Sequence, residues 1–86
     1  AEAWRDPSGA VALIAVTPHE GWVGKPVSEF ESATGTRAAL FTRFGTGQLP
    51  QSNTLIQSGD TLHVLATDER RDVLRDVAGR APEAAS

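Results

Sequence analysis

The 86-residue chain contains no cysteine. It therefore has no disulfide scaffold, no thiolate nucleophile and no zinc site with sulfur ligands. It also has no long apolar run. The longest one, Ala10–Val16, has seven residues, far fewer than the ~20 that a transmembrane helix needs. These absences suit a reducing compartment and argue against direct membrane insertion, so any link to a membrane would go through a partner.

Basic residues are scarce and scattered. Eight Lys and Arg stand against eleven Asp and Glu, which gives a net charge of −3. A nucleic-acid-binding domain needs basic side chains gathered on one face or stripe, so the sequence argues against a nucleic-acid partner. The first residues also lack the charged and apolar regions of a signal peptide. We therefore expect a cytoplasmic protein.

The length favours one small domain. A domain of this size buries only about 60–65% of the surface that its unfolded chain exposes, so self-association would add stability. We expect an N-terminal arm or linker over residues 1–9, a folded domain over residues 10–80 and a disordered tail over residues 81–86. Trp4, the only large apolar residue of the arm, either caps an edge of the core or contacts another domain or subunit.

The first predicted strand, residues 10–16, is apolar on both of its faces. A strand of this kind is covered on both sides. We therefore place it at the centre of a sheet. Helices are expected on one side of that sheet, and the other side is available to a second subunit.

A short helix is expected next, because Pro26 suits a first helical turn and Gly35 stands where a helix commonly stops. Ser28 and Glu31 have the spacing of a capping box at its N-terminus. The remaining predicted elements are strands over residues 36–44, 48–50 and 61–66 and a helix over residues 68–80. The order strand–helix–strand–strand–strand–helix predicts an α+β fold with one small sheet and two helices.

Alternation along the strand over residues 36–44 places Arg37, Phe41 and Arg43 on one face. Two interpretations of this face stay open. Either it is half exposed and the arginine stems cover the aromatic ring, or the arginines contact a ligand or a second subunit.

No catalytic constellation is evident, and we do not expect an enzyme. Ser28 is explained by its capping role and has no histidine near it in the sequence. His19, His63 and Glu20 could form a metal site, but they stand on different elements, and we expect the histidines to face solvent or a partner. A further group could bind a divalent cation but is more typical of a solvated helix N-terminus: Asp68, Glu69 and Asp72.

Three stretches carry a resemblance to a known family. They read VALIAV followed by VGKPVSEF, then TGTRAALFTRFG, then LPQSNTLIQSGDTLHVLATDE. In this order, and with their glycines at these spacings, they resemble the C-terminal regulatory domain of potassium-transport regulators, the RCK-C or TrkA-C domain. The resemblance covers residues 10 to about 77.

The resemblance implies a homodimer that binds a small ligand near the dimer interface. Domains of this family gate Trk- or Ktr-type potassium channels and some cation antiporters, and they usually follow a Rossmann-type nucleotide-binding domain. This chain has no Gly-rich phosphate loop of its own. The partner would be a membrane channel or antiporter subunit, contacted directly or through an attached Rossmann-type domain. The chain would then lie at the inner face of the membrane.

Some members of the family bind cyclic di-AMP between two subunits, against the first helix and the strand after it. The matching residues of this chain are Phe30, Glu31, Arg37, Ala38, Ala39, Leu49 and Pro50. Known binders have a basic residue where Glu31 stands, and a carboxylate facing a phosphodiester would repel it. The guanidinium of Arg37 suits phosphate and would compensate.

The expected function is therefore that of a cytoplasmic domain that dimerises and senses a ligand, cyclic di-AMP or another nucleotide. It would serve a potassium or other monovalent cation transport system. Two alternatives stay open: a purely structural dimerisation module without a ligand, and a regulatory domain of a cation/proton antiporter.

Overall fold

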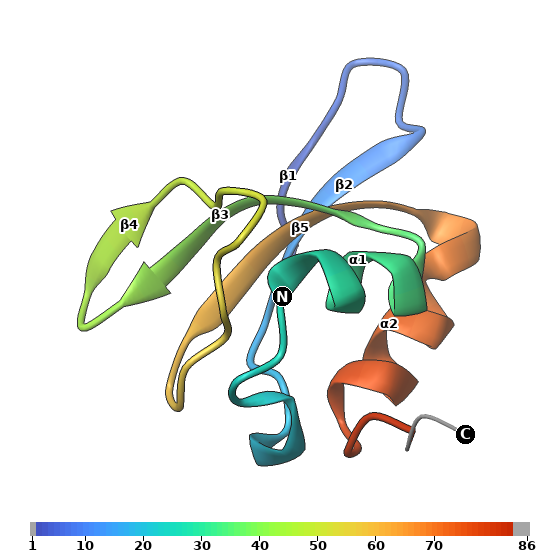
Figure 1. Ribbon diagram of the computed structural model, residues 1–86. Helices are drawn as coiled ribbons and strands as arrows, with labels where there is room; N and C mark the ends of the chain where they lie inside the picture. The colour runs from blue at the N-terminus through green and yellow to red at the C-terminus, as the bar shows by residue number, and fades with distance from the viewer. Residues whose placement is uncertain (1, 84–86) are drawn as a thin grey trace.

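The computed structural model describes residues 2–83, which form a five-stranded antiparallel sheet with two α-helices on one face (Figure 1). The strands lie in the order β1-β2-β5-β3-β4. They are β1 Glu2–Arg5, β2 Val11–Val16, β3 Arg37–Arg43, β4 Thr46–Gln48 and β5 Thr61–Thr67. The helices are α1 Val27–Thr34 and α2 Arg71–Ala78, preceded in the chain by the 3-10 helices η1 Glu20–Trp22 and η2 Asp68–Arg70. The predicted α+β class is confirmed, with one strand more than expected.

The additional strand lies in the segment that we expected to be an arm or linker. Glu2–Arg5 forms β1 and pairs antiparallel with β2. The turn between them depends on Asp6, whose carboxylate accepts the backbone N–H groups of Ser8 and Val11 at 3.0 and 2.8 Å. The Ser8 hydroxyl and these N–H groups stabilise the charged carboxylate and lower the pKa of Asp6 to about 2. Asp6 thus holds β1 against the sheet.

The hydrophobic core lies between the sheet and the helices. Ala12 lies opposite Ala66, and Ile14 lies opposite Val64, so these four side chains share the face that the helices cover. Fully burying a large apolar side chain contributes about 1.5–3 kcal/mol. The largest apolar side chains that are fully buried here are Trp22, Phe30, Ile56, Leu62, Leu74 and Val64. The helix-covered face therefore carries most of the stability of the domain.

Helix α1 begins after Pro26 and ends at Gly35, which has a φ of 70°. The left-handed conformation of Gly35 agrees with the predicted stop. The predicted capping box is wrong, because no side chain caps the helix N-terminus. The carboxylate of Glu31 instead accepts the backbone N–H of Ala38 in β3, at 2.8 Å. This bond joins α1 to the strand that follows it.

Strand β3 contains a bulge at Ala39 that breaks the predicted alternation. Arg37 lies opposite Leu65, whereas Phe41 lies opposite the buried Leu62, and the register shifts between these pairs. One extra residue moves all later side chains to the other face of the sheet. Arg37 and Phe41 therefore lie on opposite faces, and the expectation that they share one is wrong.

The last part of the chain follows the predicted order with shifted bounds. β4 occupies residues 46–48 instead of 48–50, because β3 turns into it at Phe44 and Gly45, which have φ values of 51° and 76°. The final helix, expected over residues 68–80, is divided into η2 and α2. Of the expected tail, residues 84–86 lie outside the described residues.

Candidate functional site

A polar hollow of about 420 Å³ lies where α1 ends and β3 begins. Residues three and four apart on a helix lie on the same side, and this spacing brings Ser28, Glu31 and Ser32 to the hollow. The connection from α1 to β3 supplies Gly35 and Thr36, and β3 supplies its first residue, Arg37. The lining thus combines hydroxyl, carboxylate and guanidinium groups, which suit a polar ligand.

Glu31 is the acidic group of this hollow. Its side chain is half-buried, and one carboxylate oxygen accepts the N–H of Ala38 at 2.8 Å. A charged acceptor makes a stronger hydrogen bond than a neutral one. The carboxylate therefore occupies an N–H group at the start of β3.

Arg37 is the basic group of the hollow and the first residue of β3. Its side chain is exposed. Within residues 2–83 it forms no ion pair. Its guanidinium is therefore available to a phosphate or carboxylate group of a ligand or partner.

The structure brings together only some of the residues that the family resemblance implied. Glu31 and Arg37 line the hollow, Ala38 supplies the N–H beside them, and Ala39 follows as the half-buried bulge residue. These four residues occupy one helix–strand junction. Their role in ligand binding stays a prediction.

The other three residues lie elsewhere. The side chain of Phe30 is fully buried, with its ring centroid 5.1 Å from that of Trp22 in a T-shaped arrangement. Leu49 is 78% exposed, and Pro50 is half-buried. Both follow the end of β4, and neither lines the hollow. Phe30 thus acts as a core residue in this chain.

Four of the six lining residues are absent from the predicted site: Ser28, Ser32, Gly35 and Thr36. The sequence analysis interprets Ser28 only as a cap and Gly35 only as a helix stop, and Ser32 lies one helical turn after Ser28. Thr36 is buried, and its hydroxyl bonds to that of Thr34 at 2.7 Å. The spacing of Ser28, Glu31 and Ser32 is the signal that could have identified a polar face of α1.

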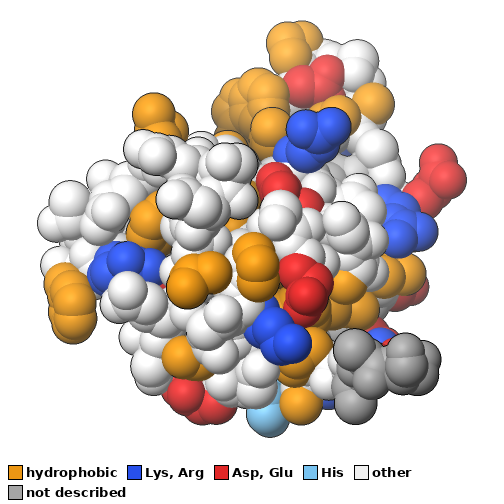
Figure 2. Space-filling model, in the orientation of Figure 1, with side chains coloured by type: hydrophobic (Ala, Val, Ile, Leu, Met, Phe, Trp, Pro, Cys, Tyr) orange, Lys and Arg blue, Asp and Glu red, His pale blue; other side chains and the backbone are white. Residues whose placement is uncertain are grey.

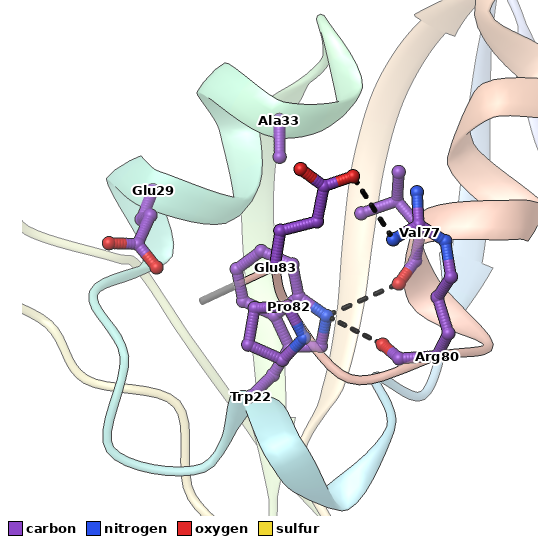
Figure 3. A pocket seen from close by; sticks show the side chains of 7 residues that line it. All are labelled: Trp22, Glu29, Ala33, Val77, Arg80, Pro82 and Glu83. Atoms are coloured by element: carbon purple, nitrogen blue, oxygen red, sulfur yellow. Dashed lines mark hydrogen bonds and ion pairs between the residues drawn. The ribbon is translucent and has the colours of Figure 1, made fainter. Parts of the chain in front are cut away.

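A second hollow, of about 340 Å³, lies between α1 and the segment after α2 (Figure 3). The indole N–H of Trp22 points to the end of α2 and donates to the carbonyls of Val77 and Arg80 at 3.2 and 3.1 Å. Carbonyls at a helix C-terminus lack helical partners, so Trp22 caps α2. The carboxylate of Glu29 pairs with Lys25, and the guanidinium of Arg80 pairs with Asp76. This hollow is therefore part of the helix packing, and we assign no ligand to it.

No group of three or more His, Cys, Asp or Glu side chains that could hold a metal ion occurs within residues 2–83. His19 Nδ1 accepts the N–H of Gly21 at 2.9 Å. His63 Nε2 lies 3.0 Å from the hydroxyl of Thr42. The two histidines therefore make separate local contacts.

The visible surface in Figure 2 carries acidic and basic side chains interspersed, without a stripe of one sign. None of the helices in the described part of the chain is long and apolar enough to span a membrane.

The sheet order and the two helices on one face define the class of the protein, a small α+β domain whose fold is that of a solved RCK domain. The sequence then gives the family. The model of the TrkA-C domain matches residues 11–79, and the chain belongs to this family. The resemblance found from the sequence is confirmed.

A curated relative is the Trk system potassium uptake protein TrkA of Streptomyces coelicolor. It is 38% identical over 80 residues, which cover 93% of this chain and 36% of the relative. The chain thus spans about a third of the length of this relative.

Two solved structures share the fold. The RCK domain of GsuK matches with a TM-score of 0.73 and 24% identity, over 96% of this chain and 19% of that one. The RCK_C domain dimer of S. agalactiae BusR in complex with c-di-AMP matches with a TM-score of 0.64 and 18% identity, over 81% of this chain and 90% of that one.

Proposed function

We propose that this chain is the regulatory domain of a potassium, or other monovalent cation, transport system. It acts at the cytoplasmic side of the membrane through a channel or antiporter subunit, directly or through an attached Rossmann-type domain. The observation that supports this most is the match of residues 11–79 to the TrkA-C family. The 38% identity to a potassium uptake protein points to the same kind of system.

The domain works as a homodimer whose subunit arrangement depends on a ligand. A ligand can shift such an equilibrium only by binding one arrangement better than the other. In this proposal the ligand lies in the hollow where α1 meets β3 and also contacts the second subunit, so it binds one subunit arrangement better than the other. The attached domain or membrane partner then responds to the favoured arrangement.

The ligand class that we propose is a nucleotide, and cyclic di-AMP is the first to test. A dimer of the same fold, that of BusR, is in complex with this ligand. The guanidinium of Arg37, which forms no ion pair with the residues that the structure describes, can bind a phosphodiester, and the hydroxyls of Ser28 and Ser32 lie in the same hollow. The charge of Glu31 opposes binding, so we expect a dissociation constant on the order of 10 μM or weaker.

Isothermal titration of the 86-residue chain with cyclic di-AMP, ATP and ADP tests this proposal. We expect Arg37→Ala to weaken binding about tenfold, because a charge-assisted contact is lost, and to leave the unfolding temperature unchanged. Arg75→Ala is a matched control, because Arg75 is also exposed but lies on α2 outside the hollow. If none of the three nucleotides binds, the sensing function fails for these ligands.

One observation favours the alternative of a purely structural dimerisation module. Glu31 already satisfies the N–H of Ala38, so the junction is complete without a ligand. An unliganded dimer that none of the nucleotides changes would support this alternative. The second alternative, a regulatory domain of a cation/proton antiporter, differs from the proposed function only in the membrane partner. The class of transporter encoded beside the gene would distinguish an antiporter regulator from a potassium channel regulator.

A further inference from the structure

Strand β1 lies at one edge of the sheet and is attached to it by few apolar contacts (Figure 1). Among the described strands it pairs with β2 alone, and its register is irregular between Glu2 and Trp4. Trp4, its one large apolar side chain, is 49% exposed. The turn at Asp6 fixes only the end of β1. Segments with few buried apolar contacts are the first to open locally, so β1 depends on further contacts to stay in place.

Four charged side chains provide such contacts, and we call them the ionic latch: Glu2, Arg5, Asp68 and Arg71. Nη2 of Arg5 and Nη2 of Arg71 both donate to Oε1 of Glu2, at 2.7 and 2.8 Å. Oδ1 of Asp68 lies 3.2 Å from Nη2 of Arg5 and 3.8 Å from Nη1 of Arg71. Glu2 and Arg5 belong to β1, whereas Asp68 begins η2 and Arg71 begins α2. The ionic latch therefore joins the edge strand to the start of the last helix.

Dissolved salt can reach the charges of the ionic latch. The side chains of Glu2, Arg5 and Arg71 are 32%, 29% and 28% exposed, and that of Asp68 is 66% exposed. The hydrogen bonds from Arg5 and then from Arg71 lower the pKa of Glu2, so its carboxylate stays charged at neutral pH. The Debye length falls from about 10 Å in 0.1 M salt to about 3 Å in 1 M salt, and exposed ion pairs weaken accordingly.

One N–H group in the ionic latch favours its opening. Nε of Arg71 is buried and has no hydrogen-bond partner among the described residues. A buried donor without a partner is costly, and this N–H can bind water once Glu2 no longer holds the guanidinium. The closed state thus depends on the attraction between the charges against the cost of this donor. A moderate loss of that attraction is therefore enough to shift the equilibrium.

We propose that the ionic latch is a salt-sensitive device: rising ionic strength screens its four charges and releases β1 from η2 and α2, while the rest of the fold stays intact. The remaining sheet does not depend on these charges, since β2 also pairs with β5, whose inner side chains are buried under the helices. For the proposed function, the latch adds ionic strength as a second input beside the nucleotide. This consequence rests on the proposed function, whereas the latch itself does not.

Hydrogen exchange of the 86-residue chain, followed by NMR at several KCl concentrations, tests the proposal. An exposed ion pair changes an equilibrium by at most a few-fold, so screening several pairs should speed exchange of the N–H groups between β1 and β2 about five- to tenfold from 0.05 to 1 M KCl. The N–H groups between β3 and β5 serve as the internal reference, and we expect them to change less than about twofold. Exchange of β1 that does not respond to salt would overturn the proposal.

The identity of the salt distinguishes screening from binding of K⁺. Screening depends on ionic strength alone, so NaCl should speed the exchange of β1 as much as KCl does. Sucrose at the same osmolality carries no charge and should leave it unchanged. If KCl acts and NaCl does not, a bound potassium ion opens β1, and the screening device is wrong.

Two variants assign the salt response to the ionic latch. Glu2→Gln removes the carboxylate that contacts both arginines, so we expect β1 to exchange about fivefold faster in 0.05 M KCl and to respond less than about twofold to further salt. Asp68→Asn should act in the same direction and leaves the sequence of β1 intact. Asp76→Asn is the matched control, because Asp76 is 67% exposed and pairs with Arg80 at the other end of α2.

The proposal fails if Glu2→Gln and Asp68→Asn both keep the salt response of the wild type, as Asp76→Asn is expected to do. These measurements contain no nucleotide. Their failure would therefore leave the proposed function standing, and a failure of the nucleotide titrations would leave the latch standing.

Discussion

Arg43 and Asp60 form a bidentate ion pair that joins the end of β3 to the turn before β5. Nε of Arg43 donates to Oδ1 of Asp60 at 2.9 Å, and Nη2 donates to Oδ2 at 2.8 Å. The side chain of Asp60 is 1% exposed, and that of Arg43 is 19% exposed. The guanidinium also lies 4.9 Å from the ring centroid of Phe41. An arginine thus covers the ring of Phe41, as one interpretation of this strand expected, but the guanidinium does so and the ring is buried in the core instead of half exposed.

Replacing Arg43 by methionine is expected to destabilise the domain by about 3 kcal/mol, because it leaves the carboxylate of Asp60 buried without its partner. Urea unfolding followed by circular dichroism measures this loss. Arg80→Met is the control, because the ion pair of Arg80 with Asp76 lies on the surface, with Arg80 45% exposed. A surface pair contributes about 0–1 kcal/mol. Equal losses for the two variants would contradict the role of the Arg43–Asp60 pair.

The same pair predicts how stability depends on pH. The hydrogen bonds from Arg43 lower the pKa of Asp60 below its ordinary 3.8, against the opposing effect of burial. A group whose pKa is lower in the folded state stabilises the fold above its unfolded pKa, and this contribution is lost as the pH falls through the folded pKa.

We therefore expect the difference in unfolding free energy between wild type and Asp60→Asn to stay constant from about pH 7 to 5 and to shrink below about pH 4. Urea titrations at several pH values measure it. Comparing the two proteins removes the effect of carboxylates such as Asp6, whose pKa is also lowered. A difference that is the same at about pH 6 and pH 3 would contradict the prediction.

Strand β2 and the end of helix α1 were predictable because the sequence signals for them are local. Residues 10–16 are apolar on both faces, and Gly35 ends a short helix with a φ of 70°. β1 was missed because it is an edge strand with a single large apolar residue, Trp4, and a polar turn held by Asp6. The bulge at Ala39 was missed because alternation along one strand does not reveal the register of its neighbours.

The candidate site was predictable only in part. The family resemblance identified Glu31 and Arg37, and the structure brings both to one hollow. The spacing of Ser28 and Glu31 indicated a capping box, but the partner of Glu31 is the N–H of Ala38, seven residues ahead. That contact depends on how α1 packs on β3, which the helix sequence alone does not determine. The burial of Phe30 likewise depends on its contact with Trp22.

Phe44 predicts a stabilising substitution in the β3–β4 hairpin. Phe44 and Gly45 both have positive φ, 51° and 76°, a pattern typical of a type I′ turn, in which Asn-Gly is favoured. Phe44 is 96% exposed, so it contributes little to the core. A left-handed conformation costs an ordinary residue about 1–2 kcal/mol. We expect Phe44→Asn to raise the unfolding free energy by about 1 kcal/mol.

Thermal and urea unfolding measure this gain. Leu49→Asn removes another apolar side chain that is 78% exposed, and Leu49 does not have a positive φ. We expect this control to change stability by less than about 0.5 kcal/mol. A Phe44→Asn protein that unfolds more easily than the wild type would mean that the phenylalanine makes a contact that outweighs its backbone strain.

Glu31→Gln separates the two roles of Glu31. Glutamine keeps an oxygen that can accept the N–H of Ala38 but removes the charge that repels phosphate, so stability should change by less than about 1 kcal/mol. Removing a like charge near a bound phosphodiester is worth about 1 kcal/mol, so we expect cyclic di-AMP to bind about fivefold more tightly. Calorimetric titration measures this gain in affinity, at low salt because salt screens the repulsion.

Glu29→Gln is the control on the same helix, since Glu29 does not line this hollow. If Glu31→Gln binds no better than Glu29→Gln, the carboxylate does not face the ligand, and the nucleotide site lies elsewhere.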